Sequence, residues 1–248
     1  YLGCALAIFV VWKRAPSIEF ARLKDDLLIA SAYSRLLTSN RHLFIRTMCL
    51  LFAFAFFTAA GESFGSDTLA ANTLMMQLLL MAAYGMDGFA YAVEGLSGHR
   101  LGARDLEGFY AAVRRCALWT MVTATLVSGG LLLQQQPLMQ RLTDINPVRE
   151  LMGEYFSWLV LLPLLAAPSY LLDGVFIGSS ETRYMRDTML FSLLVVYLPA
   201  WFMTSSWGNH GLWFAFTAFN LSRGISLHLC FRSLDRSGGW LENASRGR

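Results

Sequence analysis

One stretch of the chain decides the fold: Leu69–Leu96 reads LAANTLMMQLLLMAAYGMDGFAYAVEGL. Its only charged residues are Asp87 and Glu94. A helix needs about 20 predominantly apolar residues to cross the hydrocarbon core of a bilayer. At about 1.5 Å per residue this stretch is roughly 42 Å long as a helix. It therefore predicts a membrane-spanning helix that tilts or projects from the bilayer.

Apolar runs of similar length recur along the chain. Its 248 residues are 55% hydrophobic and 15% charged, with a mean hydropathy of +0.45. A soluble domain carries about 25% charged residues, so this composition argues against a soluble globular protein. The sequence predicts an all-α integral membrane protein with six transmembrane helices, preceded by the end of another. The six predicted spans are Leu43–Ala60, Leu69–Leu96, Cys116–Gln134, Tyr155–Ile177, Met189–Ser206 and Gly211–Phe231.

The basic residues give an independent indication of topology. Sixteen of the 20 Lys and Arg residues lie in alternate loops and the C-terminal tail, and only Arg141 and Arg149 lie in the intervening loops. Short loops rich in Lys and Arg stay in the cytoplasm. We therefore expect a multi-pass protein of a bacterial-type inner membrane with a cytoplasmic C-terminus. Arg46 and Arg223 fall inside spans, and Arg46 is close enough to a span end to snorkel to the interface.

The spans divide the chain into four segments. Residues 1–12 are expected to be the end of a truncated transmembrane helix, and residues 43–231 the six-helix bundle. Residues 13–42 are expected to form a cytoplasmic connector, since apolar and charged residues alternate at helical spacing within it, which is typical of an interfacial amphipathic helix. Residues 232–248 are rich in Ser, Gly and Arg and are expected to be a mobile cytoplasmic tail.

A polar stripe runs along the long second span. Residues spaced alternately four and three apart share one face of a helix. Because six of the seven residues have a polar group, we expect this face to line a cavity or meet a polar partner rather than lipid. The alternative is that its two carboxylates only bond to neighbouring helices. The stripe consists of Thr73, Gln77, Leu80, Tyr84, Asp87, Tyr91 and Glu94.

A second stripe on the same span contains only small residues, which allow another helix to approach closely. Close helix packing is therefore expected on this face. The small residues are Gly85, Gly88, Ala92 and Gly95.

Two further spans carry intramembrane charges. Asp173 follows Pro163 and Pro168, which should kink the fourth span. Arg223 lies in the sixth span. A charge at the centre of a spanning helix costs about 2.5–3.5 kcal/mol on insertion scales, so these residues need partners. A salt bridge from Arg223 to Asp173 or Asp87 is our hypothesis.

Several function classes lack a supporting pattern. The net charge of +3 argues against a nucleic-acid binder, which needs a strongly basic face. The four Cys and four His residues show no metal-ligand spacing. There is no phosphate loop, dinucleotide fingerprint or nucleophile elbow. We expect neither an enzyme nor a cofactor or metal site.

The stretch Tyr84–Asp105, YGMDGFAYAVEGLSGHRLGARD, resembles the MATE (multidrug and toxic compound extrusion) family, in particular its DinF-like branch. Three further stretches match in order: Gly65–Asn72, Leu171–Gly178 and Gly208–Trp213. The resemblance covers essentially the whole chain. It implies a transporter of twelve helices in two six-helix bundles, of which this chain is the C-terminal bundle and residues 17–39 the connector.

The resemblance also implies an antiporter that exports mostly cationic or amphipathic compounds in exchange for H⁺ or Na⁺. Asp173 matches an acidic position that some relatives use in cation coupling, and Asp87 belongs to the Asp-Gly-Phe pattern of the DinF-like branch. Relatives with a C-terminal cation site carry a further Glu in the helix corresponding to Met48–Phe57, which has no carboxylate here. The coupling Asp typical of the branch belongs to the first helix, outside this chain.

The leading interpretation is half of a cation-coupled multidrug antiporter, embedded in membrane lipid and completed by an N-terminal six-helix bundle. The alternatives are a lipid-linked oligosaccharide flippase of the wider superfamily and a nonfunctional membrane remnant. Candidates for cation coupling or the cavity are Asp87, Asp173, Glu94 and Arg223, and candidates for the substrate cavity are Tyr84, Tyr91, Gln77 and Asn220.

Overall fold

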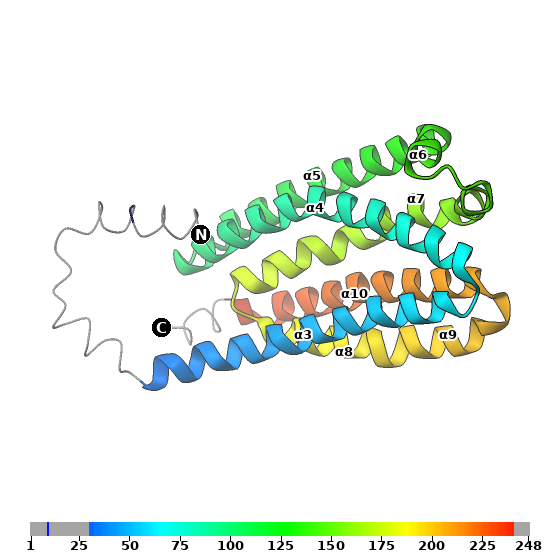
Figure 1. Cartoon of the computed structure of the whole chain (residues 1–248). Coiled ribbons are helices and arrows are strands. Elements are labelled where there is room, and N and C mark those ends of the chain that lie inside the picture. The colour runs from blue at the N-terminus through cyan, green and yellow to red at the C-terminus, as the bar shows by residue number, and fades with distance from the viewer. Residues whose placement is uncertain (1–8, 10–29, 241–248) are drawn as a thin grey trace. The chain divides into compact units, whose positions relative to one another are not determined.

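The computed structural model describes residue 9 and residues 30–240. All secondary structure in this range is helical (Figure 1), which confirms the predicted fold class. The chain divides into two units, residues 1–40 and 41–248, and the helical bundle belongs to the second. The helices are α3 (Ala30–Glu62), α4 (Ser66–Gly102), α5 (Leu106–Leu133), α6 (Gln135–Leu142), α7 (Asn146–Gly178), α8 (Thr182–Phe191), α9 (Leu198–Thr204) and α10 (Asn209–Ser237).

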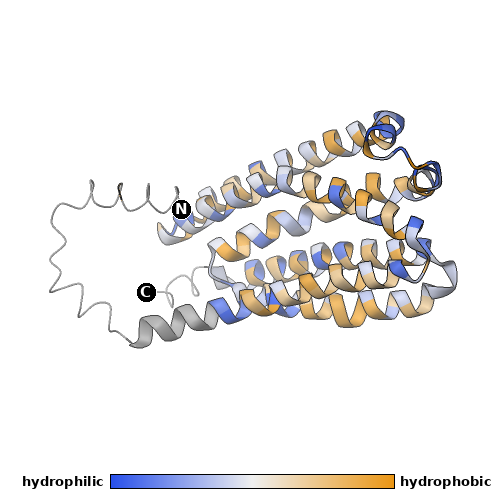
Figure 2. Cartoon of the chain, viewed as in Figure 1, coloured by the Kyte–Doolittle hydropathy of each residue, from blue (hydrophilic) through white to orange (hydrophobic). Residues whose placement is uncertain are grey.

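In the described part of the chain, five segments are long and apolar enough to cross a membrane, and apolar residues run along them in Figure 2. Each overlaps one of the first five predicted spans. In the fifth, a π-helical turn (Ser192–Tyr197) joins α8 to α9, and a 3₁₀ turn (Ser205–Trp207) follows. The five segments are Asn40–Glu62, Ser66–Gly102, Leu106–Leu133, Asn146–Gly178 and Thr182–Trp207.

The sixth predicted span lies inside α10, which is not one of these five segments. α10 has 29 residues, so its length would suffice. Its hydropathy is lower because it carries polar residues, of which Asn220 and Arg223 are buried against other helices of the bundle. By length and composition the described residues thus give five of the six predicted spans, and a membrane crossing by α10 stays a prediction.

α7 is the central helix of the bundle and packs against α4, α5 and α10. Figure 1 shows it between α5 and α10. Leu159, Val175 and Phe176 on α7 are completely buried. A local hydrogen bond holds the loop between α4 and α5. The Asp105 carboxylate caps α5 by accepting from the Gly108 N–H at 2.8 Å, and this bond holds the pKa of Asp105 below its usual range.

Glycines on α7 bring α4 into backbone contact with it. A Cβ on Gly174 would lie 2.2 Å from the Ala90 carbonyl oxygen, and a Cβ on Gly178 would lie 2.2 Å from the Glu94 carbonyl oxygen. On α4, Gly98 faces the Gly178 carbonyl in the same way, at 2.9 Å. This is the close approach that small residues four apart permit in membrane helices.

The predicted close packing on the small stripe of α4 is wrong for the described residues. A Cβ on Gly85, Gly88 or Gly95 would meet no atom of the described chain within 4 Å, and Ala92 is exposed. The reason is that the face of α4 that meets α7 includes the Ala90 backbone, and Ala90 lies two positions, or roughly half a turn, from both Gly88 and Ala92. The small residues are therefore on a free face.

Aromatic packing extends the fold beyond the last predicted span. Trp240 is buried and its ring lies 5.2 Å from Phe109, 5.8 Å from Phe176 and 5.1 Å from Phe231. The prediction of a mobile tail is therefore wrong as far as Trp240. The predicted terminal segment 1–12, apart from Phe9, and residues 13–29 of the connector lie outside the described residues, whereas α3 already begins at Ala30.

Gly174→Ala should destabilise the bundle by about 1–3 kcal/mol, because the atom that blocks the new methyl group is a backbone oxygen and cannot rotate away. Gly88→Ala is the matched control on the free face, where the change should stabilise the helix by about 0.5–1 kcal/mol. Thermal unfolding of the purified chain in detergent, followed by circular dichroism, measures both. Equal melting temperatures would contradict the close contact.

Candidate functional site

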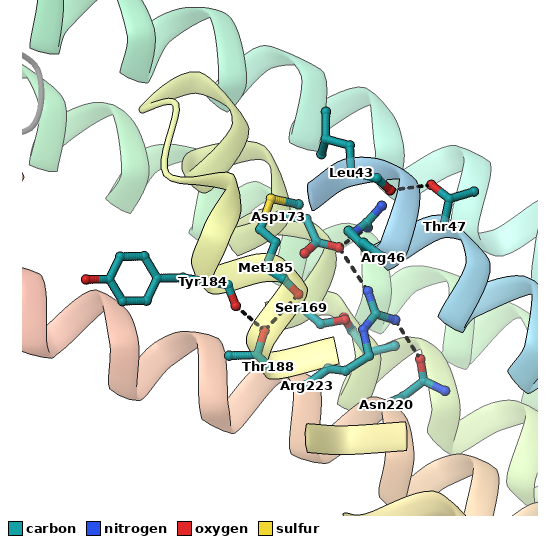
Figure 3. Close-up of polar contacts among 11 residues, drawn as sticks. Leu43, Arg46, Thr47, Ser169, Asp173, Tyr184, Met185, Thr188, Asn220 and Arg223 are labelled. Atoms are coloured by element: carbon teal, nitrogen blue, oxygen red, sulfur yellow. Dashed lines mark hydrogen bonds and ion pairs between the residues drawn. The ribbon is translucent and has the colours of Figure 1, made fainter. Parts of the chain in front are cut away.

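Three charged side chains from three helices meet inside the bundle (Figure 3). Asp173 Oδ2 accepts a hydrogen bond from Arg223 Nη2 at 2.9 Å and a second from Arg46 Nη2. The exposed fractions of these side chains are 8% for Asp173, 4% for Arg223 and 19% for Arg46. The hypothesis of an Arg223–Asp173 salt bridge is confirmed, and α3, α7 and α10 are tied together at this carboxylate.

The expectation that Arg46 snorkels to the interface is wrong. Its guanidinium turns inward to Asp173, because an ion pair inside the bundle satisfies a charge that would otherwise have to reach water. The sequence contained a signal for this pairing. Arg46 lies one turn inside the predicted cytoplasmic end of its span, and Asp173 lies one turn inside the predicted cytoplasmic end of the fourth span.

α10 supports the Arg223 guanidinium with two further groups. Asn220 Oδ1 accepts from Arg223 Nη1 at 3.4 Å, and the Phe219 ring lies 5.6 Å from the guanidinium carbon, within the range of a cation–π interaction. The Asn220 amide donates to the Phe216 carbonyl at 2.9 Å. Asn220 was predicted to line a substrate cavity, but it is 4% exposed and its polar atoms are bound to its own helix. It positions Arg223 instead.

Asp87 lies near this cluster without joining it by a hydrogen bond. It is half-buried on α4, within electrostatic reach of Arg46 and Asp173. No side chain in residues 40–240 donates a hydrogen bond to its carboxylate, and the buried Arg46 Nε–H has no acceptor there. Two arginines and one aspartate leave the buried cluster with an excess positive charge, and Asp87 supplies the opposite charge nearby.

The polar stripe of α4 faces away from the rest of the bundle. Tyr84 and Tyr91 are each 71% exposed, and Gln77 is also exposed. Glu94 is half-buried, with its backbone against α7. Residues 41–240 thus leave most of the stripe uncovered, and a cavity at this face stays a prediction.

No group of three or more His, Cys, Asp or Glu side chains that could hold a metal ion occurs in the part of the chain that the structure describes. The carboxylates of the site are paired with arginines or isolated, and a cation at Asp173 would meet two guanidinium charges. Within the described residues, the polar groups around Asp173 are thus arranged as ion pairs.

The helical bundle, with apolar spans around a buried charged centre, is that of an integral membrane protein. Its residues 43–202 match the model of the MatE family, and the chain belongs to this family. It is 38% identical over 213 residues to DNA damage-inducible protein F of Escherichia coli, covering 84% of this chain and 45% of that protein. It is 21% identical over 223 residues to Protein DETOXIFICATION 42 of Arabidopsis thaliana, covering 88% of this chain and 41% of that protein.

Solved structures share the fold. The MATE transporter VcmN of Vibrio cholerae matches with a TM-score of 0.85 at 18% identity, covering 97% of this chain and 54% of that chain. A MOP superfamily transporter of Pyrococcus furiosus matches with a TM-score of 0.69 at 17% identity, covering 76% of this chain and 43% of that chain. The chain spans about half the length of these relatives. The predicted resemblance to MATE transporters is confirmed.

Asp173→Asn should lower the free energy of unfolding by about 3–5 kcal/mol, because it leaves two buried guanidinium groups without a carboxylate. Arg223→Met should cost less, since Asp173 keeps Arg46. Adding Arg223→Met to Asp173→Asn should restore part of the loss, because only the more exposed Arg46 then lacks a partner. Arg186→Gln, which removes the exposed pair with Asp187, is the control.

These four variants are compared by thermal unfolding in detergent. The claim that Asp173 binds both arginines is contradicted if Arg223→Met is as destabilising as Asp173→Asn, or if the double variant is no more stable than Asp173→Asn alone.

Proposed function

We propose that this chain forms one half of a secondary active transporter that exports drugs or other xenobiotic compounds across the inner membrane in exchange for H⁺ or Na⁺. Its partner would be an N-terminal six-helix bundle, since the relatives it matches are about twice as long. Membership of the MatE family supports transport as the activity. The observation that carries the proposal is the uncovered polar stripe of α4, with Asp87 between two exposed tyrosines.

The stripe supports binding of a cationic or amphipathic compound. Tyr84, Asp87 and Tyr91 lie on one face of α4, three and four residues apart, so a carboxylate lies between two aromatic rings. A cation over such a ring is attracted by its π-electrons, and an acidic group adds a charge of the right sign. Gln77 and Thr73 extend the same face with neutral polar groups.

The charge arrangement supports Asp87 rather than Asp173 as the group that exchanges a cation. Asp173 accepts hydrogen bonds from two guanidinium groups, and their positive charges repel a further cation. Asp87 receives no such hydrogen bond from residues 40–240 and is partly exposed. Protonation of Asp87 would remove the charge that offsets Arg46, so it would change the balance between conformations that differ in its exposure. This favours H⁺ over Na⁺ as the coupling ion.

Asp87→Asn, introduced into the complete gene, should reduce export of a fluorescent cationic dye to the level of cells without the gene. Asp67→Asn is the matched control, because Asp67 is an exposed carboxylate in the first turn of the same helix. Inverted membrane vesicles with an imposed pH gradient or Na⁺ gradient give the readout. Wild-type export by Asp87→Asn would remove this residue from the mechanism, and export driven by Na⁺ alone would overturn proton coupling.

Tyr84→Ala and Tyr91→Ala should each raise the concentration of a cationic dye needed for half-maximal export by roughly two- to fivefold, the value of an exposed cation–π contact. Tyr84→Phe and Tyr91→Phe keep the ring and should behave as wild type. A neutral compound of similar size should be affected less. An equal effect on the neutral compound would indicate that the two rings contribute van der Waals contacts rather than cation–π interactions.

A lipid-linked oligosaccharide flippase is supported less. Such a substrate is anionic and needs exposed basic groups, whereas Arg223 is 4% exposed and Arg46 is paired with Asp173. The exposed stripe carries carboxylates instead. For a nonfunctional remnant, the deciding observation is the gene sequence upstream of Tyr1: an in-frame N-terminal bundle supports the transporter, and a stop codon supports the remnant.

A further inference from the structure

A groove on the outer surface of the bundle is separate from the site on α3 and α4. It lies between α5 and α10 with α7 as its floor, and its volume is about 240 Å³. Ala117 and Met121 form part of the α5 wall, Pro168 and Leu171 part of the floor, and Phe231 part of the α10 wall. The groove exists because α5 and α10 each pack on α7 (Figure 1).

The lining of this groove is almost entirely apolar. Among its lining residues only Thr120 and His228 have polar side chains, and the Thr120 hydroxyl donates to the Cys116 carbonyl at 2.8 Å. His228 is exposed at the rim. An apolar groove of this kind offers shape and dispersion contacts to a hydrocarbon chain and few hydrogen bonds to a polar solute.

The surfaces beside the groove indicate that it opens to lipid. Leu118 and Trp119 on α5 are 63% and 58% exposed, and Ile225 and Leu229 on α10 are 52% and 60% exposed. Large apolar side chains exposed in this density belong in a hydrocarbon environment. The face is thus unlike the polar stripe of α4, where tyrosines and Gln77 are exposed beside half-buried carboxylates.

One end of the groove is closed and flanked by positive charge. The Tyr110 hydroxyl donates to Asp235 Oδ1 and joins the two walls there. Arg114 lies one turn before the wall residue Ala117 on α5, and Arg232 lies one turn after His228 on α10. Both arginines are exposed, and neither has an ion-pair partner in residues 40–240. This is the end of the bundle that the basic loops predict to be cytoplasmic.

We propose that the groove binds an anionic phospholipid of the cytoplasmic leaflet. One acyl chain lies along the floor formed by Pro168 and Leu171, and the phosphate lies between Arg114 and Arg232. Transfer of an acyl chain from bulk lipid into the groove gains little, because lipid tails are as apolar as the groove. Selectivity therefore comes from the headgroup, at about fivefold per arginine for a charge at a membrane surface.

Native mass spectrometry of the purified chain in detergent tests this proposal, with equimolar phosphatidylglycerol and phosphatidylcholine as the probes. The wild-type chain should retain more phosphatidylglycerol than phosphatidylcholine. The double variant Arg114→Gln/Arg232→Gln should lose that preference by roughly tenfold or more. The matched control Arg104→Gln/Arg183→Gln removes two exposed arginines predicted to be on the same side of the membrane but away from the groove, and it should keep the preference.

A second pair of variants tests the groove itself. Ala117→Phe fills it and should reduce retention of both lipids, whereas Val122→Phe adds the same ring outside the groove lining and should not. Ala117→Leu, a smaller change, should give an intermediate loss if Ala117→Phe fails to fold, as judged by circular dichroism. Equal retention of both lipids by wild type, equal losses in both arginine pairs, or unchanged retention by the folded Ala117 variants would overturn the proposal.

Discussion

The bundle depends on one buried carboxylate. Asp173 on α7 accepts hydrogen bonds from Arg223 on α10 and from Arg46 on α3, in surroundings that leave it 8% exposed. Removing one partner from a buried ion pair leaves an uncompensated charge, which is far more costly than the net value of the pair. Three helices are therefore held at one relative depth, because sliding any of them along its axis would separate charges that water cannot reach.

The second constraint is the backbone contact between α4 and α7. Gly174 and Gly178 remove the side chains that would keep these helices apart, and the Ala90 and Glu94 carbonyls fill that space. Fixing this face of α4 also fixes the directions of its other faces, and Tyr84 and Tyr91 are left exposed on one of them. The same helix thus carries a packed face and a free polar face, and Asp87 lies between the buried charges and the free surface.

Much of this architecture could be predicted from local patterns. Apolar runs identify five of the spans because hydrocarbon imposes length and composition on every lipid-facing helix. The need of Arg223 for a carboxylate partner follows from the cost of an unpaired charge inside a span, which left Asp173 and Asp87 as the two predicted partners. The orientation of Arg46 could not be predicted, because a side chain one turn inside a span end can either snorkel to the interface or face inward. Trp240 was missed because its aromatic partners are distant in sequence.

The sequence by itself determined the membrane class and the set of charges that must find partners, since both follow from composition and spacing along single helices. It indicated the family through the resemblance of stretches such as Tyr84–Asp105. Only the tertiary structure decided which glycines form the helix contact, which arginines share Asp173, and that Asn220 supports Arg223 rather than lining a cavity. These outcomes depend on the rotation of each helix about its axis. That rotation is set by packing between helices far apart in the chain, and a periodic pattern along one helix does not determine it.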